Sequence, residues 1–245
     1  MYEDFAYIYD KLSFDIDYER YAQNIKDLCK KYQVGKENML ELAAGSGMLT
    51  RHFFDDFEKI DALDISPDML KVFAQKYDAD NVNLIYYDMV SFINEKTYDL
   101  IVILLDSVNY VTEKEELIEL FENSYKNLKD DSLLVFDINS EYKIKEIFGS
   151  KCYVYEYEDI FYTWDNFFED DLCDMHLDFF IREEGDTYRR IREFQQERLY
   201  KVEEIKEILE NIGFSHIEIC DEDDMGELKP DTMRILFSAK KEKNE

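Results

Sequence analysis

The chain has 245 residues, of which 46% are hydrophobic, so it can bury a core as one large domain or as one domain with an elaboration. Its 58 acidic and 29 basic side chains give a net charge of −29, which argues against nucleic acid or an anionic membrane as a partner. The four cysteines are scattered without a CxxC pair, and no run approaches 18 apolar residues. We therefore expect a reduced, cytoplasmic protein without a metal site or a membrane span.

The first twelve residues are aromatic and acidic, and a periodic segment follows them. From Asp17, which suits an N-cap, apolar side chains recur at helical spacing and predict a helix against a sheet. Before it, the segment that ends at Leu12 carries Phe5, Tyr7 and Tyr9, more large apolar groups than a solvated tail. This segment can cover a ligand as a lid or pack as an ordinary arm, and the sequence leaves both readings open.

The segment NMLELAAGSGMLT at residues 38–50 organises the next part of the chain. Its first half reads as a short apolar strand, and small residues follow as far as Gly47. Apolar side chains at helical spacing in residues 48–54 predict a helix after this turn. Ligands bind at such strand-to-helix turns in open α/β sheets, and Gly45 lets a ligand approach the main chain closely. A tight turn without a ligand is the alternative.

Carboxylates end the next two predicted strands. Asp64 lies 19 residues after Gly45, close to the distance of about 20 at which a βαβ unit places an acid against ribose hydroxyls. Ser66 suits the N-cap of the following helix, and Met69 in its first turn can lie on a flat ring or belong to the core. The carboxylate of Asp88, after the third strand, can accept a hydrogen bond from an exocyclic amine such as that of adenine.

The middle of the chain continues the alternation of strand and helix. The run YDLIVILL at 98–105 predicts a strand buried on both faces, and it stops at a polar cluster at 106–110. An apolar helical stripe over 117–128 and a strand over 132–138 follow. Repeated strand and helix, with polar residues at one edge, predict a doubly wound parallel sheet of the α/β class.

Residues 148–200 interrupt this alternation. Their aromatic runs, separated by acidic or glycine-containing turns, predict three or more antiparallel strands. An insertion after the fifth strand lies at the carboxyl edge of the sheet, where it can cap a substrate or mediate dimer contacts. A helix that stops at Gly213 and two strands at 215–220 and 232–239 then end the chain.

Five segments resemble, in order, the motifs of class I S-adenosylmethionine-dependent methyltransferases: ELAAGSG at 41–47, LDISPDML at 63–70, YYDM at 86–89, YDLIVILLDSVNY at 98–110 and LLVFDIN at 133–139. The opening segment and residues 189–213 resemble more narrowly the bacterial YqeM-like small methyltransferases of unassigned substrate. These are similar to sugar and other small-molecule N-methyltransferases. The resemblance implies a Rossmann-like, seven-stranded domain from 1–139 and 201–245, and an antiparallel β cap at 140–200.

The resemblance also implies a cofactor, S-adenosylmethionine, with S-adenosylhomocysteine as product. Asp64 then holds the ribose, and Asp106 lies at the sulfonium end. Ala43 stands where a glycine is commonest, and Gln195 stands where related sequences often carry a histidine. The residues that the resemblance places at the cofactor are Tyr9, Ala43, Ala44, Gly45, Asp64, Ile65, Met69, Asp88, Met89, Leu105 and Asp106.

Transfer from a sulfonium is an in-line displacement, so the protein has to align the reactants and exclude water. An amine acceptor needs only to arrive neutral, whereas a hydroxyl needs a base, and we therefore favour a small-molecule amine. His176 falls in an alternating strand, where an imidazole is more often packed or solvated. No base is assigned; the candidate catalytic residues are Tyr9, Tyr18, Asn109, Tyr110, His176 and Glu193.

Other functions stay open at this point. A nicotinamide-dependent dehydrogenase would need a small residue at Thr50 and would leave Asp88 unexplained. A sensor or scaffold could bind the cofactor without turnover. Protein or RNA could be the acceptor, although the net charge disfavours RNA. Both a monomer and a homodimer fit the sequence.

Overall fold

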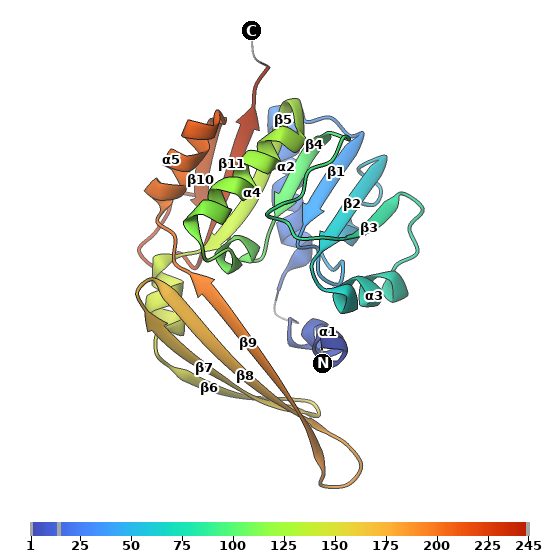
Figure 1. Cartoon of the computed structure of the whole chain (residues 1–245), viewed down its shortest axis with the longest axis vertical. Coiled ribbons are helices and arrows are strands. Elements are labelled where there is room, and N and C mark those ends of the chain that lie inside the picture. The colour runs from blue at the N-terminus through green and yellow to red at the C-terminus, as the bar shows by residue number, and fades with distance from the viewer. Residues whose placement is uncertain (1, 14–15, 244–245) are drawn as a thin grey trace.

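The computed structural model describes residues 2–13 and 16–243. They form two β-sheets, with helices on both faces of the larger one (Figure 1). The larger sheet contains β1 (Asn38–Leu42), β2 (Lys59–Asp64), β3 (Val82–Tyr86), β4 (Tyr98–Ile103), β5 (Leu128–Asn139), β10 (Ser215–Asp221) and β11 (Arg234–Lys241). The smaller sheet contains β6 (Cys152–Tyr157), β7 (Ile160–Glu169), β8 (Leu172–Arg182) and β9 (Tyr188–Arg198). The α-helices are α1 (Tyr2–Leu12), α2 (Tyr18–Tyr32), α3 (Pro67–Lys76), α4 (Lys114–Asn127) and α5 (Val202–Ile212).

The larger sheet has the strand order β10-β11-β5-β4-β1-β2-β3. β1 to β5 are parallel, whereas β11 is antiparallel to both of its neighbours. The chain therefore starts at β1 in the middle, winds outward to β3, and returns to fill the other half. This arrangement confirms the predicted doubly wound, seven-stranded α/β sheet. It brings the carboxyl ends of β1, β2, β4 and β5 to one edge.

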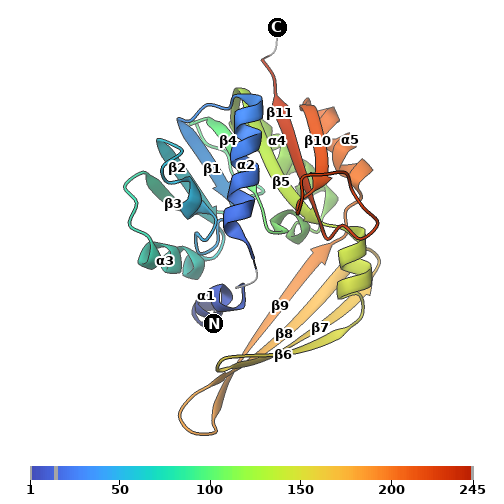
Figure 2. The same ribbon diagram turned by 180° about the vertical axis from the view of Figure 1, so that it is seen from behind.

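Two hydrophobic layers hold the helices against this sheet. α4 and α5 cover one face, and α2 covers the other (Figures 1 and 2). On the first face, the ring centroid of Phe136 lies 4.8 Å from that of Phe121 and 4.9 Å from that of Phe237. On the second face, Ile25 of α2 and Phe53 are fully buried. Every residue of β4 is buried, as its continuous apolar run predicts.

The predicted ends of three helices are confirmed. The Asp17 side chain accepts a hydrogen bond from the Arg20 N–H at the start of α2. The Ser66 hydroxyl accepts one from the Met69 N–H at the start of α3. Gly213 ends α5 in the left-handed conformation, with φ of 113°. These caps fix where α2 and α3 begin near the edge that carries the site.

The helix predicted over residues 48–54 is wrong. The segment forms turns and one short 3-10 helix, η1 (Thr50–Phe53). The Arg51 N–H bonds a carbonyl four residues back, whereas the N–H groups of His52 and Asp56 bond carbonyls three residues back. Bonds of this kind tighten the backbone into 3-10 turns. The apolar side chains at this spacing are nevertheless buried beneath α2, so the pattern indicated burial correctly and the helix type wrongly.

The smaller sheet follows β5 and a short π-helix, η3 (Lys143–Phe148), and it confirms the expected antiparallel strands. Its order is β6-β7-β8-β9, and it projects from the end of the larger sheet at which the parallel strands finish (Figure 1). Side chains on one of its faces, among them Met175 and Phe179, form a separate apolar cluster with Ile144 and Phe148. The division of the chain into a cofactor domain and a cap at 140–200 stays a prediction.

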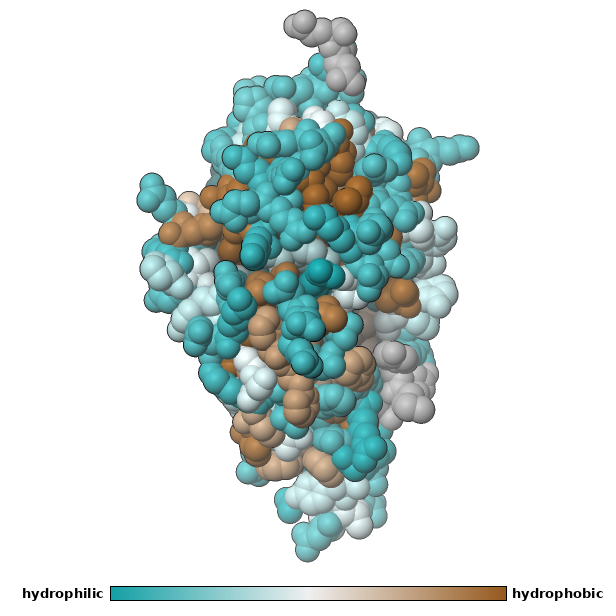
Figure 3. All heavy atoms as spheres, turned by 60° about the vertical axis from the view of Figure 1, so that its left-hand side comes forward, coloured by the Kyte–Doolittle hydropathy of each residue, from teal (hydrophilic) through white to brown (hydrophobic). Residues whose placement is uncertain are grey.

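The surface follows the acidic composition. On the face shown in Figure 3, hydrophilic residues predominate, and the strongly hydrophobic ones occur in small separate patches. No helix among the described residues is long and apolar enough to cross a membrane.

Candidate active site

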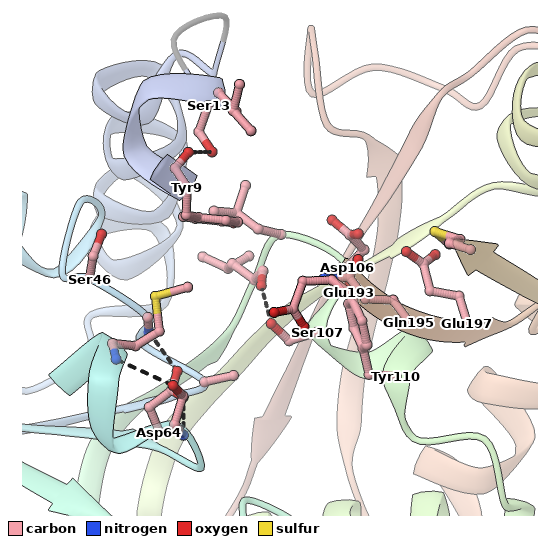
Figure 4. A pocket seen from close by; sticks show the side chains of 18 of the residues that line it. Tyr9, Ser13, Ser46, Asp64, Asp106, Ser107, Tyr110, Glu193, Gln195 and Glu197 are labelled. Carbon is pink, nitrogen blue, oxygen red and sulfur yellow. Dashed lines mark hydrogen bonds between the residues drawn. The ribbon is translucent and has the colours of Figure 1, made fainter. Parts of the chain in front are cut away.

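A cavity of about 1180 Å³ lies where the carboxyl ends of β1, β2 and β4 face α1 and the smaller sheet (Figure 4). All eleven residues that the sequence placed at the cofactor line this cavity. They come from six separate segments of the chain, which the parallel sheet and α1 bring together. That these residues contact the cofactor stays a prediction.

The glycine loop after β1 forms one wall of the cavity. Ala43, Gly45 and Gly47 have φ values of 58°, 56° and 79°, in the left-handed region that favours glycine. A Cβ built on Gly45 would meet nothing within 4 Å, whereas one on Gly47 would lie 2.3 Å from the Phe73 ring. Gly47 therefore allows the loop to pack on α3, and Gly45 leaves open space beside its main chain. Ala43 adopts the strained conformation that explains why a glycine suits this position.

Asp64 at the end of β2 ties this loop to α3. Its Oδ2 accepts the Gly45 N–H at 2.7 Å, and its Oδ1 accepts the Ser66 N–H at 2.7 Å. The side chain is buried, and burial raises its pKa although these N–H groups oppose the shift. Each carboxylate oxygen has two lone pairs, so both can still accept a ligand hydroxyl.

Glu41 in β1 is a site residue that sequence reasoning missed. It lines the cavity and is 4% exposed, and its Oε2 has no hydrogen-bond partner among the described residues. Burial raises the pKa of Glu41 to about 8. The available signal was an acid in the middle of the apolar run NMLEL, since strands buried on both faces rarely contain one.

An apolar surface faces the cavity beside Asp64. Ile65 is 64% exposed although it is large and hydrophobic, and Met69 lies in the first turn of α3. Asp88 and Met89 line the same side of the cavity after β3. An exposed apolar side chain within a cavity indicates a surface that a ligand covers.

The end of β4 is held by a carboxylate from β5. Leu105 and Asp106 have φ values of 56° and 59°, and both of their N–H groups donate to Asp137, at 3.0 and 2.6 Å. Arg234 of β11 places Nη1 2.5 Å from Asp106 Oδ1 and 3.1 Å from Asp137 Oδ1. The two acids and the cation thus fix Asp106 in an unusual backbone conformation at the floor of the cavity.

Glu197 of β9 extends this network into the smaller sheet. The Asn139 amide donates to Glu197 Oε2 at 2.6 Å, and Lys143 Nζ donates to Asn139 Oδ1 at 2.8 Å. Burial raises the pKa of Glu197, whereas at Asp106 the nearby Arg234 and Lys143 outweigh burial and lower the pKa. The two carboxyl groups are also hydrogen-bonded to each other, and the pKa of Glu197 lies above that of Asp106.

α1 covers the cavity opposite the sheet. Tyr9 and Ser13 line the cavity, and the Ser13 hydroxyl donates to the Tyr9 carbonyl at 2.8 Å (Figure 4). Asp10 accepts hydrogen bonds from Lys76 of α3, at 2.6 Å, and from the hydroxyl of Ser46 in the glycine loop. α1 therefore packs over the cavity, and both readings that the sequence left open, a lid and an ordinary arm, stay predictions. The sequence also named Phe5 and Tyr7 in this covering segment, but their side chains are not among those that the structure describes.

Comparison with known proteins identifies this site. Residues 39–131 match a family described as a methyltransferase domain. The chain is 30% identical to the putative methyltransferase YqeM of Bacillus subtilis, over 99% of this chain and 98% of that protein. The chain belongs to the S-adenosylmethionine-dependent methyltransferases. A crystal structure of such an enzyme from Clostridium acetobutylicum is 32% identical, covers 99% of each chain and superposes with a TM-score of 0.90.

A more distant relative of this methyltransferase has a name that specifies its acceptor. It is the dTDP-3-amino-3,6-dideoxy-α-D-glucopyranose N,N-dimethyltransferase of Streptomyces fradiae, 26% identical over 49% of this chain and 47% of that protein.

The residues of this methyltransferase fit its cofactor, S-adenosylmethionine. Asp64 offers two carboxylate oxygens to a ribose, and the exposed Ile65 offers an apolar surface to a flat ring. Glu41 leaves a buried carboxyl oxygen without a partner, which suits an ammonium group. The open space at Gly45 lets a ligand lie along the main chain. No group of three or more metal-ligating side chains occurs among the described residues.

Two of the six candidate catalytic residues lie outside the cavity. Asn109 is fully buried, and its amide bonds the Arg198 carbonyl and the Asn139 N–H, so it joins β5 to the smaller sheet. His176 is exposed on the outer face of β8, because its neighbours Met175 and Leu177 face the cavity and side chains alternate along a strand. These two proposals are therefore corrected: neither side chain reaches the methyltransferase site.

The other candidates do line the cavity: Tyr9, Tyr18, Tyr110 and Glu193. Tyr110 donates its hydroxyl to Gln195 Oε1 at 3.1 Å, so the position at which related sequences often carry a histidine belongs to the site. Burial raises the pKa of both Tyr9 and Tyr110. These phenols are therefore donors rather than bases near neutral pH.

Proposed function

We propose that this methyltransferase transfers a methyl group to a nitrogen of a small-molecule amine. The observation that carries the proposal is the concave cavity beyond Asp106, which residues of α1 line on one side and residues of β7, β8 and β9 line on the other. A concave cavity of this kind fits a metabolite, whereas a folded protein or an RNA helix needs a broad open surface. The acidic composition disfavours RNA independently.

On the cofactor side, we assign each interaction to a group already in place. Asp64 holds the ribose hydroxyls, Ile65 and Met69 flank the adenine, and Asp88 accepts from its exocyclic amine. Glu41 ionises when it binds the ammonium of the methionine part, since a nearby cation lowers the pKa of a carboxyl. When bound, S-adenosylmethionine supplies the electrophilic methyl group. The protein's part is to orient the acceptor and exclude water, and α1 contributes by covering the site.

Nitrogen is favoured over oxygen because of the groups that face the transfer region. A hydroxyl acceptor has to lose a proton to a base, whereas an amine attacks once it is neutral. None of the three histidines lines the cavity. Asp106 is a carboxylate held by Arg234, too weak a base for a hydroxyl but able to accept a hydrogen bond from an amine. The relative named as an amino-sugar N,N-dimethyltransferase also supports nitrogen.

The proposal is tested by release of S-adenosylhomocysteine with four acceptor pools: small amines, hydroxylated metabolites without nitrogen, peptides and tRNA. We expect turnover with the amine pool alone. Turnover confined to the hydroxylated pool would contradict the choice of nitrogen, and turnover with peptides or tRNA would contradict the concave small-molecule site. Cofactor binding without turnover in any pool would favour a sensor. Calorimetry of S-adenosylmethionine binding on the same preparation distinguishes these outcomes from an inactive protein.

A further inference from the structure

One strand of the smaller sheet presents a row of polar side chains to the acceptor side of the cavity. Residues 193–197 of β9 all line the cavity, and of these the alternate residues Glu193, Gln195 and Glu197 lie on one face of the sheet, opposite Leu177, Met175 and Cys173 of β8. Figure 4 shows this row facing the region of Asp106 and Tyr110. We call Glu193, Gln195 and Glu197 the β9 row.

The charge around the β9 row is negative. The only cations among the described lining residues are Lys143 and Arg234. Arg234 contacts two aspartates, and Lys143 donates to Asn139 within the same acidic cluster. Neither cation is therefore available to neutralise an anionic ligand. The carboxyl groups that line the acceptor side are those of Asp106, Glu116, Glu156, Glu193 and Glu197.

Glu193 differs from the other two members of the row. Gln195 bonds Tyr110, and Glu197 bonds Asn139 and Asp106. Glu193 is partly buried and makes no hydrogen bond or ion pair with any residue in the described ranges 2–13 and 16–243. Burial raises its pKa. A partly dehydrated carboxyl gains from a cationic ligand that comes within hydrogen-bond distance of it.

Apolar and aromatic side chains lie beside this row on the same face of the sheet. Trp164 of β7, and Met175, Leu177 and Phe179 of β8, line the cavity. Such a wall accommodates hydrocarbon or a sugar ring, and an ammonium group is also attracted to aromatic faces. A phosphoryl group would have to lose its water here without gaining a counter-ion.

We infer that the β9 row is an acceptor subsite for a cationic amine whose remaining body carries no phosphoryl or carboxylate group, and that Glu193 selects the cation. The inference rests on the proposed methyl transfer to nitrogen and specifies its substrate class. It separates this chain from the relative whose name gives a dTDP-linked amino sugar, because a nucleotide diphosphate would meet carboxyl groups here and no available cation.

Affinity of cofactor analogues can test this without knowledge of the natural acceptor. We would measure S-adenosylhomocysteine and three analogues in which nitrogen replaces sulfur and carries a three-carbon arm. The arms end in an ammonium, a hydroxyl or a phosphonate group. Each arm is attached to the nitrogen that replaces the sulfur, so it takes the place of the transferred methyl group. We expect the ammonium arm to bind about tenfold tighter than the hydroxyl arm, and the phosphonate arm about tenfold weaker.

Glu193→Gln keeps the shape of the side chain and removes its charge, so it should bring the ammonium and hydroxyl arms to similar affinities. Glu184→Gln, at the exposed β8–β9 turn, is the matched control and should leave their ratio unchanged. A phosphonate arm that binds as tightly as the ammonium arm would overturn the inference, and so would an unchanged ratio in Glu193→Gln. Methylation of a phosphorylated amine would overturn only this inference, whereas failure of S-adenosylhomocysteine itself to bind would undermine the proposed function as well.

Discussion

The contact between Asp10, Lys76 and Ser46 predicts that α1 slows the release of the cofactor. Asp10 belongs to α1, Lys76 to α3 and Ser46 to the glycine loop, so the contact joins the covering helix to both walls of the cofactor side. Asp10→Asn and Lys76→Met each break the ion pair. Because both residues lie outside the cavity lining, these changes open the cover without removing a ligand contact.

The expected contribution of the Asp10–Lys76 ion pair to the free energy of closing follows from the burial of its two side chains. The side chains of Asp10 and Lys76 are 22% and 26% exposed, between a surface pair and a buried one. Exposed ion pairs contribute about 0.2 to 1 kcal/mol and charge-assisted hydrogen bonds about 1.5 to 3, so we take about 1 to 2 kcal/mol for this contact. That free energy corresponds to about a 5- to 30-fold change in the ratio of open to closed α1. Cofactor dissociation should accelerate by the same factor.

Stopped-flow displacement of S-adenosylhomocysteine measures this rate, and Trp164, the chain's one tryptophan, lines the cavity as a fluorescent reporter. The double variant should dissociate no faster than either single variant, since each single change already breaks the pair. Lys126→Met, which breaks an exposed pair with Glu122 on α4, is the charge-matched control. Dissociation rates equal to wild type in both single variants would show that α1 is an ordinary packed arm.

Three further predictions concern the cofactor side. Glu41→Gln should raise Tm more at pH 8 than at pH 5. The folded state keeps the Glu41 proton up to about pH 8, whereas the unfolded chain loses it above about pH 4.5, so Glu41 lowers the unfolding free energy by about 1.4 kcal/mol for each pH unit between these values. Equal gains in Tm at both pH values would refute this. Ala43→Gly should raise the unfolding free energy in urea by about 1 kcal/mol by relieving a φ of 58°, and a loss of stability would contradict the strain. Asp64→Asn should weaken S-adenosylhomocysteine binding in calorimetry by about 1.5 to 3 kcal/mol, whereas unchanged affinity would remove Asp64 from the site.

Asparagine is the better substitution at position 64 because the structure shows a second role for the side chain. Asp64→Ala would leave the buried N–H groups of Gly45 and Ser66 without acceptors, which costs about 1 to 3 kcal/mol for each group. A binding loss in that variant would therefore mix a damaged loop with a lost ligand contact. Asparagine retains one carboxamide oxygen as an acceptor and isolates the charge more closely.

The part of the fold that the sequence predicted well depends on local properties. A short apolar run that ends in a small residue or a carboxylate marks the carboxyl end of a parallel strand, and β1, β2 and β4 all follow this rule. Since those ends must meet at one edge, Gly45, Asp64 and Asp106 could be assigned to one cavity in advance. The 3-10 turns after Gly47 could not be predicted. Whether each backbone N–H bonds the carbonyl three or four residues back depends on how Phe53 packs beneath α2.

The acceptor side depends on contacts that no local pattern records. Asp106 is held by Asp137 of β5 and by Arg234 of β11, and it is hydrogen-bonded to Glu197 of β9. The smaller sheet thus supplies one carboxyl group of a pair whose other member ends β4.

Alternation along β9 does predict that Glu193 and Glu197 share a face, but not that this face turns toward the cofactor side. The path of the chain through η3 determines which way this face turns, and it also places His176 on the outer face of β8. The charge of the acceptor site is therefore a property of the join between the two sheets, and variants at that join should alter acceptor choice before they alter cofactor binding.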